Sequence, residues 1–356
     1  MKVALVHDYL REYGGGERVL EVLHSMYPEA PVYTAYYFAD SMPESFKSWD
    51  IRTSLMQKWW GIKNKYLWYT YSVPWMLEQF DLRGYDLIIS SSSFAAKGVL
   101  THPGQVHVDY CHTPTRFVWG INRTSNRKFI HALLGPVDTF LRQWDFAAAQ
   151  RVDYFIANSK TVQERITRFY KRDSIVIYPP VELPNSSAES AAGSCYLMIG
   201  RLERLKNVDV IIRAFNRLGL PLRIAGTGSE ELSLKAIANK NIEFCGYVSD
   251  AYRKDLYRNC LALVVAAENE DFGMTLPEVQ SFGRPVIALR SGGYVESIVE
   301  DKTGIFFDKL GEEQVIEAVE RFQKSVFDPA IIREHARIFS KDEFVLKFSR
   351  FIETVV

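Results

Sequence analysis

The sequence predicts an α/β protein built from two Rossmann-like, doubly wound domains with parallel sheets. A chain of 356 residues is too long for one ordinary core, so two domains are expected. Short runs rich in Val and Ile alternate with longer amphipathic stretches, as in parallel sheets covered by helices on both faces. The Pro- and Ser-rich segment 179–194 interrupts this alternation, which then starts again.

Each domain contains six expected strands. In the first domain they are residues 2–9, 31–37, 86–92, 105–111, 153–159 and 174–180. In the second domain they are residues 195–201, 222–228, 242–248, 261–267, 285–290 and 304–307. We therefore expect a first domain at 1–181, a linker at 182–194, a second domain at 195–335 and a C-terminal helix at 336–356 that packs back on the first domain. Two such domains facing each other would border a central cleft with the carboxyl ends of their strands, where this architecture binds ligands.

The composition excludes several broad classes of protein. Lys plus Arg equals Asp plus Glu at 43 each, so the charge gives no support for a nucleic-acid-binding protein. The longest apolar run, 261–267, is far shorter than the ~20 residues of a membrane-spanning helix. The first ten residues are a poor signal peptide, and the four cysteines form no C-x-x-C motif. A cytoplasmic protein, or one docked on the cytoplasmic face of a membrane, is expected.

A glycine-rich loop, YGGGERV (13–19), follows the first expected strand and opens a helix. Glycines let the backbone approach a ligand closely, and the N–H groups at a helix start suit an anion. The loop is not a G-x-G-x-x-G dinucleotide fingerprint. A flexible turn is the alternative interpretation.

Two further loops follow strands of the second domain. GRLERLKN (200–207) places Arg201 and Lys206 after a strand, where a forked guanidinium and an ammonium could clamp a diphosphate. A solvated surface loop explains the same residues equally well. AGTGSEE (225–231) contains a G-x-G but lacks the third glycine, so a plain turn explains it as well as a phosphate site does.

CHTPTRF (111–117) places His112 at the end of an expected strand, where a histidine is well positioned for chemistry. A metal site with the nearby His102, His107, Asp109 and Cys111 is an alternative. Strand alternation puts residues 107, 109 and 111 on one face and His112 on the other, which disfavours a shared metal ion.

A loop with four carboxylates, ENEDFGMTLPE (268–278), follows the expected buried strand 261–267. The backbone N–H groups of residues 273–276 are expected to point out of the helix start and to form an anion nest. Glu270 precedes this nest and Glu278 lies in the first turns of the helix. Because carboxylates accept hydrogen bonds from vicinal hydroxyls, we expect these acids to flank the anion site rather than to fill it. Helix capping by surface acids is the alternative.

An aromatic segment, KWWGIKNKYLWYTYSVPWMLEQF (58–80), contains four tryptophans and three lysines. Aromatic rings interspersed with lysines are typical of a membrane interface or of a site for a lipid-linked acceptor. A packed helix pair within the first domain is the alternative, since Leu67, Val73 and Leu77 could all be core residues.

Taken together, GGGERV, HTPTRF, GRLERLK, FCGYVSD, EDFGMTLPE and GRPVIALRSGGYVE occur in an order that resembles the family 4 retaining glycosyltransferases of the GT-B fold. The local pattern HDYL…GGGERVLE with CHTPTRFVW resembles WbaZ-type mannosyltransferases of surface polysaccharide synthesis. The resemblance implies two Rossmann-like domains, a nucleotide-sugar donor and a lipid-linked or growing glycan acceptor. It implies no cofactor beyond the donor, which would be GDP-mannose or, second, UDP-glucose.

The resemblance also implies roles for the matching residues. His112 would contact the transferred sugar, Glu270 would hold its hydroxyls, and Arg201 and Lys206 would stabilise the departing diphosphate. The donor-binding set would be Gly15, Gly16, Tyr247, Gly273, Met274, Thr275, Leu276 and Glu278. Such enzymes generally need no metal ion, and cationic side chains with a helix start can supply the positive charge instead.

Three other functions are considered. A dehydrogenase is disfavoured by the missing G-x-G-x-x-G motif, and a nucleotide-sugar epimerase shares the architecture but needs no acceptor. A non-catalytic nucleotide-sugar-binding subunit would not need both His112 and Glu270.

Overall fold

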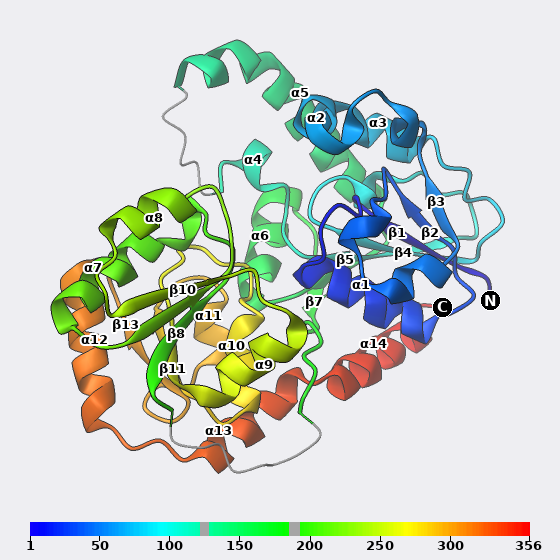
Figure 1. The fold of residues 1–356 in the computed structure, drawn as a ribbon. Coiled ribbons are helices and arrows are strands. Elements are labelled where there is room, and N and C mark those ends of the chain that lie inside the picture. The colour runs from blue at the N-terminus through cyan, green and yellow to red at the C-terminus, as the bar shows by residue number, and fades with distance from the viewer. Residues whose placement is uncertain (122–127, 185–192) are drawn as a thin grey trace. The chain divides into compact units, whose positions relative to one another are not determined.

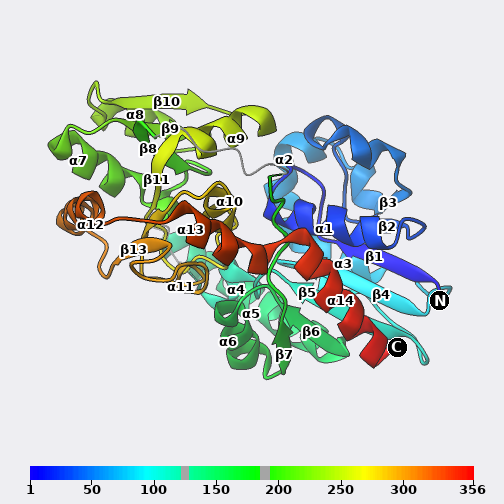
Figure 2. The same cartoon turned by 90° about the horizontal axis from the view of Figure 1, so that it is seen from below.

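The computed structural model describes residues 1–121, 128–184 and 193–356. The chain divides into two compact units, which are Met1–Pro180 with Phe344–Val356 (unit 1) and Val181–Glu343 (unit 2). Most of the predicted linker 182–194 lies outside the described residues. Each unit is a parallel sheet with helices on both faces (Figures 1 and 2), which confirms the predicted fold class.

The sheet of unit 1 has the strand order β3-β2-β1-β4-β5-β6-β7, and every neighbouring pair is parallel. Its strands are β1 (Val3–His7), β2 (Val32–Thr34), β3 (Ile51–Thr53), β4 (Leu87–Ser92), β5 (Val106–Cys111), β6 (Tyr154–Ala157) and β7 (Ser174–Val176). The chain runs outward from β1 in one direction and from β4 in the other, so the topological switch point lies between these two strands. Strand β3 was not predicted.

Two layers of helices cover the sheet of unit 1. On one face, α1 (Gly15–Met26) and the part of α14 (Lys341–Val355) from Phe344 onward pack on Leu5 and Ile89. On the other face, Ala4 and Ile88 pack with buried residues that include Ile62, Leu77 and Ala96. The other helices of unit 1 are α2 (Ile62–Tyr69), α3 (Val73–Glu78), α4 (Arg116–Trp119), α5 (Lys128–Arg151) and α6 (Lys160–Tyr170), with 3-10 turns η1 (Ala39–Ser41), η2 (Glu44–Ser48), η3 (Leu55–Lys58), η4 (Thr70–Ser72) and η5 (Ala96–Gly98).

The C-terminal segment contributes to the core of unit 1. Phe344, Phe348 and Ile352 of α14 are buried in the same cluster as β1, β4 and β5. The ring of Phe344 meets that of Tyr110 edge to face, with centroids 5.7 Å apart. Burial of this apolar stripe, rather than helix propensity, is what holds the end of the chain in place.

The sheet of unit 2 has the order β10-β9-β8-β11-β12-β13, again parallel throughout. Its strands are β8 (Cys195–Ile199), β9 (Leu222–Ala225), β10 (Ile242–Gly246), β11 (Cys260–Val265), β12 (Val286–Leu289) and β13 (Gly304–Phe307). This is the Rossmann strand order, with its switch point between β8 and β11.

The helices of unit 2 also form two layers. Buried residues of α7 and α12 pack on one face of the sheet, and those of α9, α10 and α11 pack on the other. The helices are α7 (Val208–Leu218), α8 (Glu231–Ile237), α9 (Asp250–Asn259), α10 (Thr275–Ser281), α11 (Tyr294–Ser297), α12 (Glu312–Lys324) and α13 (Pro329–Ala336), with 3-10 turns η6 (Arg204–Lys206) and η7 (Arg337–Phe339).

Several helices begin at residues whose side chains satisfy the first amide groups. Ser159 accepts a hydrogen bond from the amide of Val162 at the start of α6, and Asp328 accepts one from Ala330 at the start of α13. Helix α13 has Pro329 in its first position, where a missing N–H group costs nothing.

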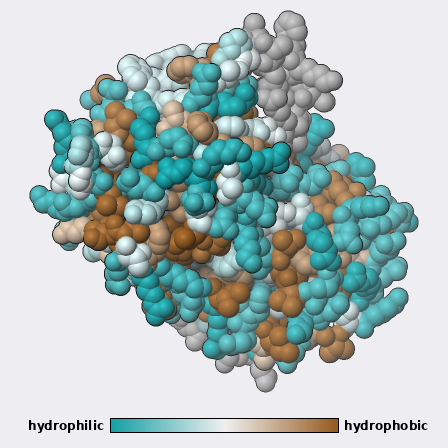
Figure 3. All heavy atoms as spheres, turned by 180° about the vertical axis from the view of Figure 1, so that it is seen from behind, coloured by the Kyte–Doolittle hydropathy of each residue, from teal (hydrophilic) through white to brown (hydrophobic). Residues whose placement is uncertain are grey.

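No helix among the described residues is both long and apolar enough to cross a bilayer. Figure 3 shows one face of the molecule, on which hydrophobic residues form several separate groups among hydrophilic ones.

Candidate functional site

The switch point of unit 2 brings together Lys206 and Glu270. Lys206 ends η6, which follows β8, and Glu270 lies in the loop after β11. Lys206 Nζ donates to Glu270 Oε2 at 2.6 Å, and both side chains are largely shielded from solvent. Asn207 supports this geometry, because its side-chain amide donates to the carbonyl of Ala266 at 3.0 Å. An ammonium and a carboxylate therefore meet at the edge where Rossmann-type sheets bind ligands.

The loop that carries Glu270 is held by a pair of glycines from another loop. A Cβ on Gly292 would lie 2.3 Å from the carbonyl oxygen of Glu270, and one on Gly293 would lie 2.4 Å from Cα of Phe272. Gly293 N–H donates to the Glu270 carbonyl at 2.9 Å, and the amide of Asn269 donates to Ser291 Oγ at 3.0 Å. The motif SGGYVE therefore positions Glu270 through its backbone, because no larger residue would allow this close approach.

The loop predicted to form an anion nest, residues 273–276, lies at the start of α10. Gly273 has a φ of 86°, and a Cβ there would lie 2.5 Å from the ring of Tyr294, so glycine is required at this turn. Met274 and Thr275 are half-buried at the start of α10. Leu276, however, is buried, and its amide already donates to the Gly273 carbonyl at 3.0 Å. The amide of Leu276 is thus used within the turn itself, and an anion site at the amides of residues 273–275 stays a prediction.

The remaining predicted donor residues occupy different environments. Glu278 is buried in α10, where Tyr257 donates its hydroxyl proton to Oε2 at 2.7 Å and Arg253 Nε lies 4.0 Å from the same oxygen. Arg201 is well exposed and pairs with Glu203 at 3.4 Å. Tyr247 follows β10 and is 85% exposed. Contact of the side chains of Glu278 and Arg201, and of the backbone of Tyr247, with a donor stays a prediction.

The G-x-G of AGTGSEE has a packing role. A Cβ on Gly226 would lie 1.9 Å from the carbonyl oxygen of Gly200, and one on Gly228 would lie 2.2 Å from that of Leu202. Leu202 also exchanges backbone hydrogen bonds with this loop, donating to Thr227 and accepting from Glu230. Both glycines are thus explained by the close approach of two backbones, and neither need contact a phosphate.

In unit 1, the glycine-rich loop lies directly against His112. Gly15 is exposed at the first position of α1. A Cβ on Gly16 would lie 3.5 Å from His112 Nε2 and 3.6 Å from the ring of His7. His112 Nε2 is 2.8 Å from Ser91 Oγ at the end of β4. The switch point of unit 1 therefore joins two sequence motifs that are about a hundred residues apart.

His107 and Asp109 lie apart from His112, as strand alternation predicted. Ser90 Oγ is hydrogen-bonded to both, at 2.8 Å to His107 Nε2 and 2.6 Å to Asp109 Oδ1. Burial raises the pKa of Asp109 to about 7 and lowers that of His107 to about 3. No group of three potential metal-ligating side chains occurs within the described ranges. The pair is best explained as a buried polar network in the core.

Comparison with known families covers most of the chain in two parts. The model of "Glycosyltransferase Family 4" matches residues 13–184, and that of "Glycosyl transferases group 1" matches residues 182–339. The chain belongs to the glycosyltransferases of the GT-B fold. This family assignment confirms the coarser part of the resemblance, whereas WbaZ-type specificity stays a prediction.

Similar curated proteins match this chain at low identity. An uncharacterized glycosyltransferase of Methanocaldococcus jannaschii is 26% identical over 56% of the chain and 59% of its own length. The alpha-1,3/1,6-mannosyltransferase ALG2 of Mus musculus is 24% identical over 69% of the chain and 68% of its own length. The O-antigen chain mannosyltransferase C of Escherichia coli is 27% identical over 37% of each chain. The match to the first of these relatives thus spans less than two thirds of its length.

Solved structures share the fold over the full chain. The apo form of the lipopolysaccharide outer core galactosyltransferase WaaB has a TM-score of 0.71, with 18% identity and complete coverage of both chains. Anabaena HepE in complex with UDP and glucose has a TM-score of 0.73, with 17% identity and 99% coverage of both chains. At these identities the similarity establishes the fold alone.

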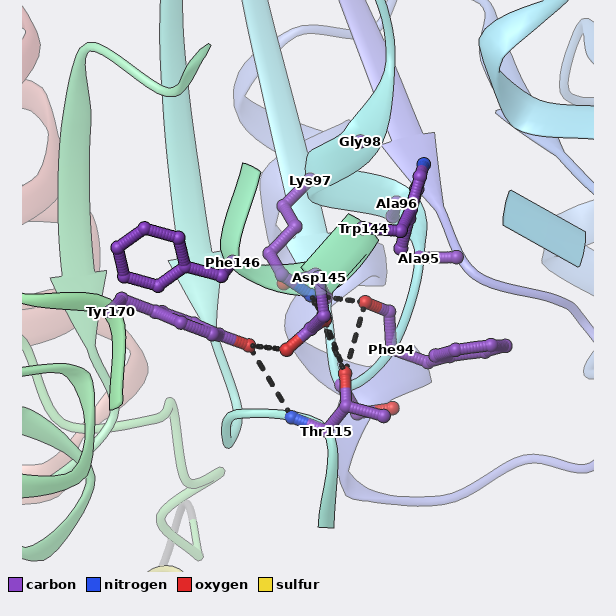
Figure 4. Close-up of polar contacts among 12 residues, drawn as sticks. Phe94, Ala95, Ala96, Lys97, Gly98, Thr115, Trp144, Asp145, Phe146 and Tyr170 are labelled. Carbon is purple, nitrogen blue, oxygen red and sulfur yellow. Dashed lines mark hydrogen bonds and ion pairs between the residues drawn. The ribbon is translucent and has the colours of Figure 1, made fainter. Parts of the chain in front are cut away.

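In unit 1, a buried ion pair lies against the loop that carries the HTPTRF motif (Figure 4). Lys97 Nζ lies 2.6 Å from Asp145 Oδ1, and both side chains are 1% exposed. Asp145 also accepts hydrogen bonds from Thr115 Oγ1 at 2.7 Å, Tyr170 OH at 2.9 Å and Trp119 Nε1 at 2.6 Å. Burial disfavours the charge of Lys97, but Asp145 outweighs this and raises the pKa of the amine. One carboxylate therefore holds two residues of the loop and helix that follow His112.

Sequence reasoning missed several residues that shape these sites. Gly292 and Gly293 lie in a motif that was noted only for its resemblance, and His7, Glu17 and Ser91 were given no role. Glu17 is visible in the sequence as the third residue of α1, a position from which a carboxylate can accept from the helix-start amides. Nothing local in the sequence points to Ser91, because its relevance depends on the pairing of β4 with β1.

Proposed function

We propose that the protein is a retaining, metal-independent hexosyltransferase that moves mannose from GDP-mannose to a lipid-linked or growing polysaccharide acceptor. The observation that carries this proposal is the Lys206–Glu270 pair at the switch point of unit 2. It combines a cation suited to a leaving diphosphate with a carboxylate suited to sugar hydroxyls. The names of two relatives, both mannosyltransferases, support mannose as the sugar.

The positive charge needed by the leaving group can come from the chain itself. Arg201 and Lys206 follow β8, and the amides of residues 273–275 lie at the start of α10. Preorganised charges and amides of this kind stabilise developing negative charge without reorganisation during the reaction. We therefore assign these groups to the diphosphate and assign Glu278, with Tyr247, to the nucleoside.

The proposed reaction breaks the bond between the anomeric carbon and the diphosphate and forms a bond to the acceptor oxygen. The acceptor hydroxyl attacks from the face on which the diphosphate leaves, so the configuration is retained. Its proton passes to a leaving phosphate oxygen. In this scheme Glu270 stays anionic beside Lys206 and holds sugar hydroxyls, and His112 contacts the transferred sugar.

Donor binding is expected to stabilise the protein selectively. GDP-mannose at a hundred times its dissociation constant should add about 2.7 kcal/mol of stability, whereas NADH should add none. Thermal-shift measurements with GDP-mannose, GDP, UDP-glucose, UDP and NADH check this. Preference for UDP-glucose would replace the donor, and NADH binding or silence across the panel would contradict the proposal.

Glu278→Gln serves as the site variant in this experiment and should remove most of the donor-induced shift. Because Glu278 is buried beside Tyr257, the variant will also change the melting temperature without ligand, so the ligand-induced difference is the quantity compared. Glu320→Gln, an exposed acid on α12, is the matched control and should keep the full shift. Turnover of GDP-mannose with a glycan acceptor then separates a transferase from an epimerase or a non-catalytic subunit.

We also propose that the segment 58–80 contacts the membrane surface where a lipid-linked acceptor resides. Trp60, Trp68 and Trp75 are 77%, 75% and 61% exposed. Lys65 Nζ lies 3.5 Å from the ring centre of Trp60 and 5.2 Å from that of Trp68. Exposed indole rings beside a lysine suit the headgroup region of a lipid bilayer. There the ring is half-inserted and the ammonium stays in water.

Trp59 does not belong to this exposed set. It is half-buried and packs against Tyr69 edge to face, with ring centroids 5.1 Å apart. Leu67 is 67% exposed, so it is not a core residue, whereas Val73 and Leu77 are buried. The segment therefore has an inner apolar side that packs in unit 1 and an outer side that carries three tryptophans.

Replacing Trp60, Trp68 and Trp75 together by serine is expected to reduce membrane binding about a hundredfold. Each half-inserted ring contributes about 1 kcal/mol, less than full burial of a large apolar side chain is worth. Flotation with vesicles of phosphatidylcholine and phosphatidylglycerol measures the bound fraction. A control that replaces the exposed Leu232 and Val326 of unit 2 should float like the wild type. Equal flotation of the triple variant and the wild type would contradict the membrane contact.

A further inference from the structure

A chain of four polar side chains runs from α1 to His112 within unit 1. Glu17 Oε1 lies 3.5 Å from His7 Nε2. His7 Nδ1 lies 3.2 Å from Ser91 Oγ, and Ser91 Oγ lies 2.8 Å from His112 Nε2. His7 is 4% exposed and Ser91 is completely buried. The two histidine rings therefore share one hydrogen-bond partner, the hydroxyl of Ser91, which is shielded from solvent.

This series of four side chains also connects His112 to the glycine-rich loop. His7 and Ser91 are register partners at the ends of β1 and β4, which flank the switch point. Glu17 lies in the first turn of α1, and its second oxygen accepts the Gly14 amide at 2.9 Å. One carboxylate thus contacts both the loop and the inner histidine.

The hydroxyl of Ser91 carries one proton, so the hydrogen bonds on its two sides depend on each other. When His7 is neutral and directs Nε2–H at Glu17, its Nδ1 accepts the Ser91 proton. Ser91 Oγ then accepts from Nε2–H of His112, which leaves Nδ1 of His112 as an acceptor.

Protonation of His7 reverses this order. Nδ1–H of His7 must now donate a hydrogen bond to Ser91 Oγ. The hydroxyl of Ser91 in turn donates its hydrogen bond to Nε2 of His112. The protons balance if one proton enters at Nδ1 of His112, the Nε2 proton passes to Ser91 Oγ and the Ser91 proton passes to His7 Nδ1. The net result is a cationic His7 beside Glu17 and a neutral His112 with its proton on Nδ1.

We propose that Glu17, His7 and Ser91 are positioning residues that switch Nδ1 of His112 from hydrogen-bond acceptor to donor when His7 gains a proton. The role of His112 toward the sugar rests on the proposed function, but the switch itself does not. Two charged groups act on His7, namely Glu17 from α1 and the neighbouring Asp8, whose carboxylate accepts from the amides of residues 93–96.

The groups around His7 favour its charged form. Burial disfavours its charged form, but the hydrogen bond and charge of Glu17 and the charge of Asp8 outweigh burial, so the pKa of His7 is raised above its usual 6.5. Burial also opposes the charge of Glu17, yet His7 and the Gly14 amide lower its pKa. The donor form of His112 is therefore present at low pH and is lost as the pH rises through the raised pKa of His7.

The test is a histidine ¹⁵N NMR titration of the full chain, since nitrogen shifts distinguish the two neutral tautomers. The chain has seven histidines, so His7 and His112 are assigned by single replacements. We expect the tautomer of His112 to change with the same midpoint as the charge of His7. In Glu17→Gln both midpoints should fall together by about one pH unit or more, because a partner charge within hydrogen-bonding reach typically shifts a pKa this much.

Two further variants make the result decisive. Ser91→Ala should leave His7 titrating while the tautomer of His112 no longer follows it. Glu21→Gln, the matched control on the same helix, removes a carboxylate that is bonded to Tyr13 and Ser45 instead, and should change neither midpoint. An identical His112 tautomer on both sides of the His7 midpoint, or coupling that survives Ser91→Ala, would overturn the proposal. Because no substrate is present, a failure here is distinct from a failure of the proposed transferase activity.

Discussion

Asp145→Ala is expected to cost unit 1 about 3–5 kcal/mol of folding free energy, because it leaves the buried charge of Lys97 without its partner. It also removes the acceptor for Thr115, Tyr170 and Trp119. Urea denaturation followed by tryptophan fluorescence measures the loss. All seven tryptophans lie between residues 49 and 144, so the signal reports on unit 1 alone.

The matched control for this prediction is an ion pair with the same N–O distance on the surface. Asp81 and Arg83 also lie 2.6 Å apart, but both side chains are well exposed. Asp81→Ala should therefore leave the urea midpoint within the scatter of the wild type, because water screens and replaces the interaction. The double replacement Lys97→Met with Asp145→Leu should recover part of the loss, since it removes both buried charges. A small effect of Asp145→Ala would contradict the structural role of the pair.

Lys206→Met is expected to lower kcat by about 10²–10³-fold, which is the typical cost of removing one preorganised group that stabilises developing charge. The replacement keeps the length of the side chain but deletes the cation that pairs with Glu270. Release of GDP from GDP-mannose at saturating donor and acceptor measures the effect. Donor affinity should change less than kcat, because the charge on the leaving group grows in the transition state.

Lys235→Met is the matched control for Lys206→Met. Lys235 pairs with Glu231 at 2.7 Å in the same unit, but along the exposed face of α8. It should retain wild-type kcat. Loss of activity in both variants would indicate a general destabilisation of unit 2, and full activity of Lys206→Met would remove Lys206 from the leaving-group site.

A variant of Glu270 distinguishes the two routes to retention. If Glu270 acted as a covalent nucleophile, Glu270→Ala would be rescued by azide, which would give a glycosyl azide of inverted configuration. In the proposed reaction the acceptor attacks from the face on which the diphosphate leaves, and no covalent intermediate forms. Azide then gives no such product. The short bond to Lys206 favours the second route, because a cation at 2.6 Å reduces the nucleophilicity of the carboxylate.

The strand prediction succeeded where the chain carries a strong local signal. Runs such as LALVVAA and DLIISSS are short and contain consecutive aliphatic residues, as buried strands do, and both form central strands. Strand β3 was missed because Ile-Arg-Thr is only three residues long and is half-exposed. It exists because Val32 to Thr34 offer it a partner edge, which no local pattern encodes.

The candidate sites were predictable as motifs and unpredictable as contacts. Local composition identified the loops that hold Lys206 and Glu270, but their 2.6 Å bond depends on the pairing of β8 with β11. The same holds for Trp59 and Trp60, which are neighbours of identical type. Only packing against Tyr69 decides that one faces inward and the other faces solvent.

The sequence by itself determined the two α/β units, the loops at their strand ends and the types of side chain that those loops supply. These features depend on local periodicity, turn residues and composition, which act over a few neighbouring positions. The tertiary structure alone decided that Gly292 supports Glu270, that Asp145 forms an ion pair with Lys97 and that Ser91 links His7 to His112. Each of these contacts joins residues from separate elements, so it follows from strand order, register and burial rather than from any single stretch of the chain.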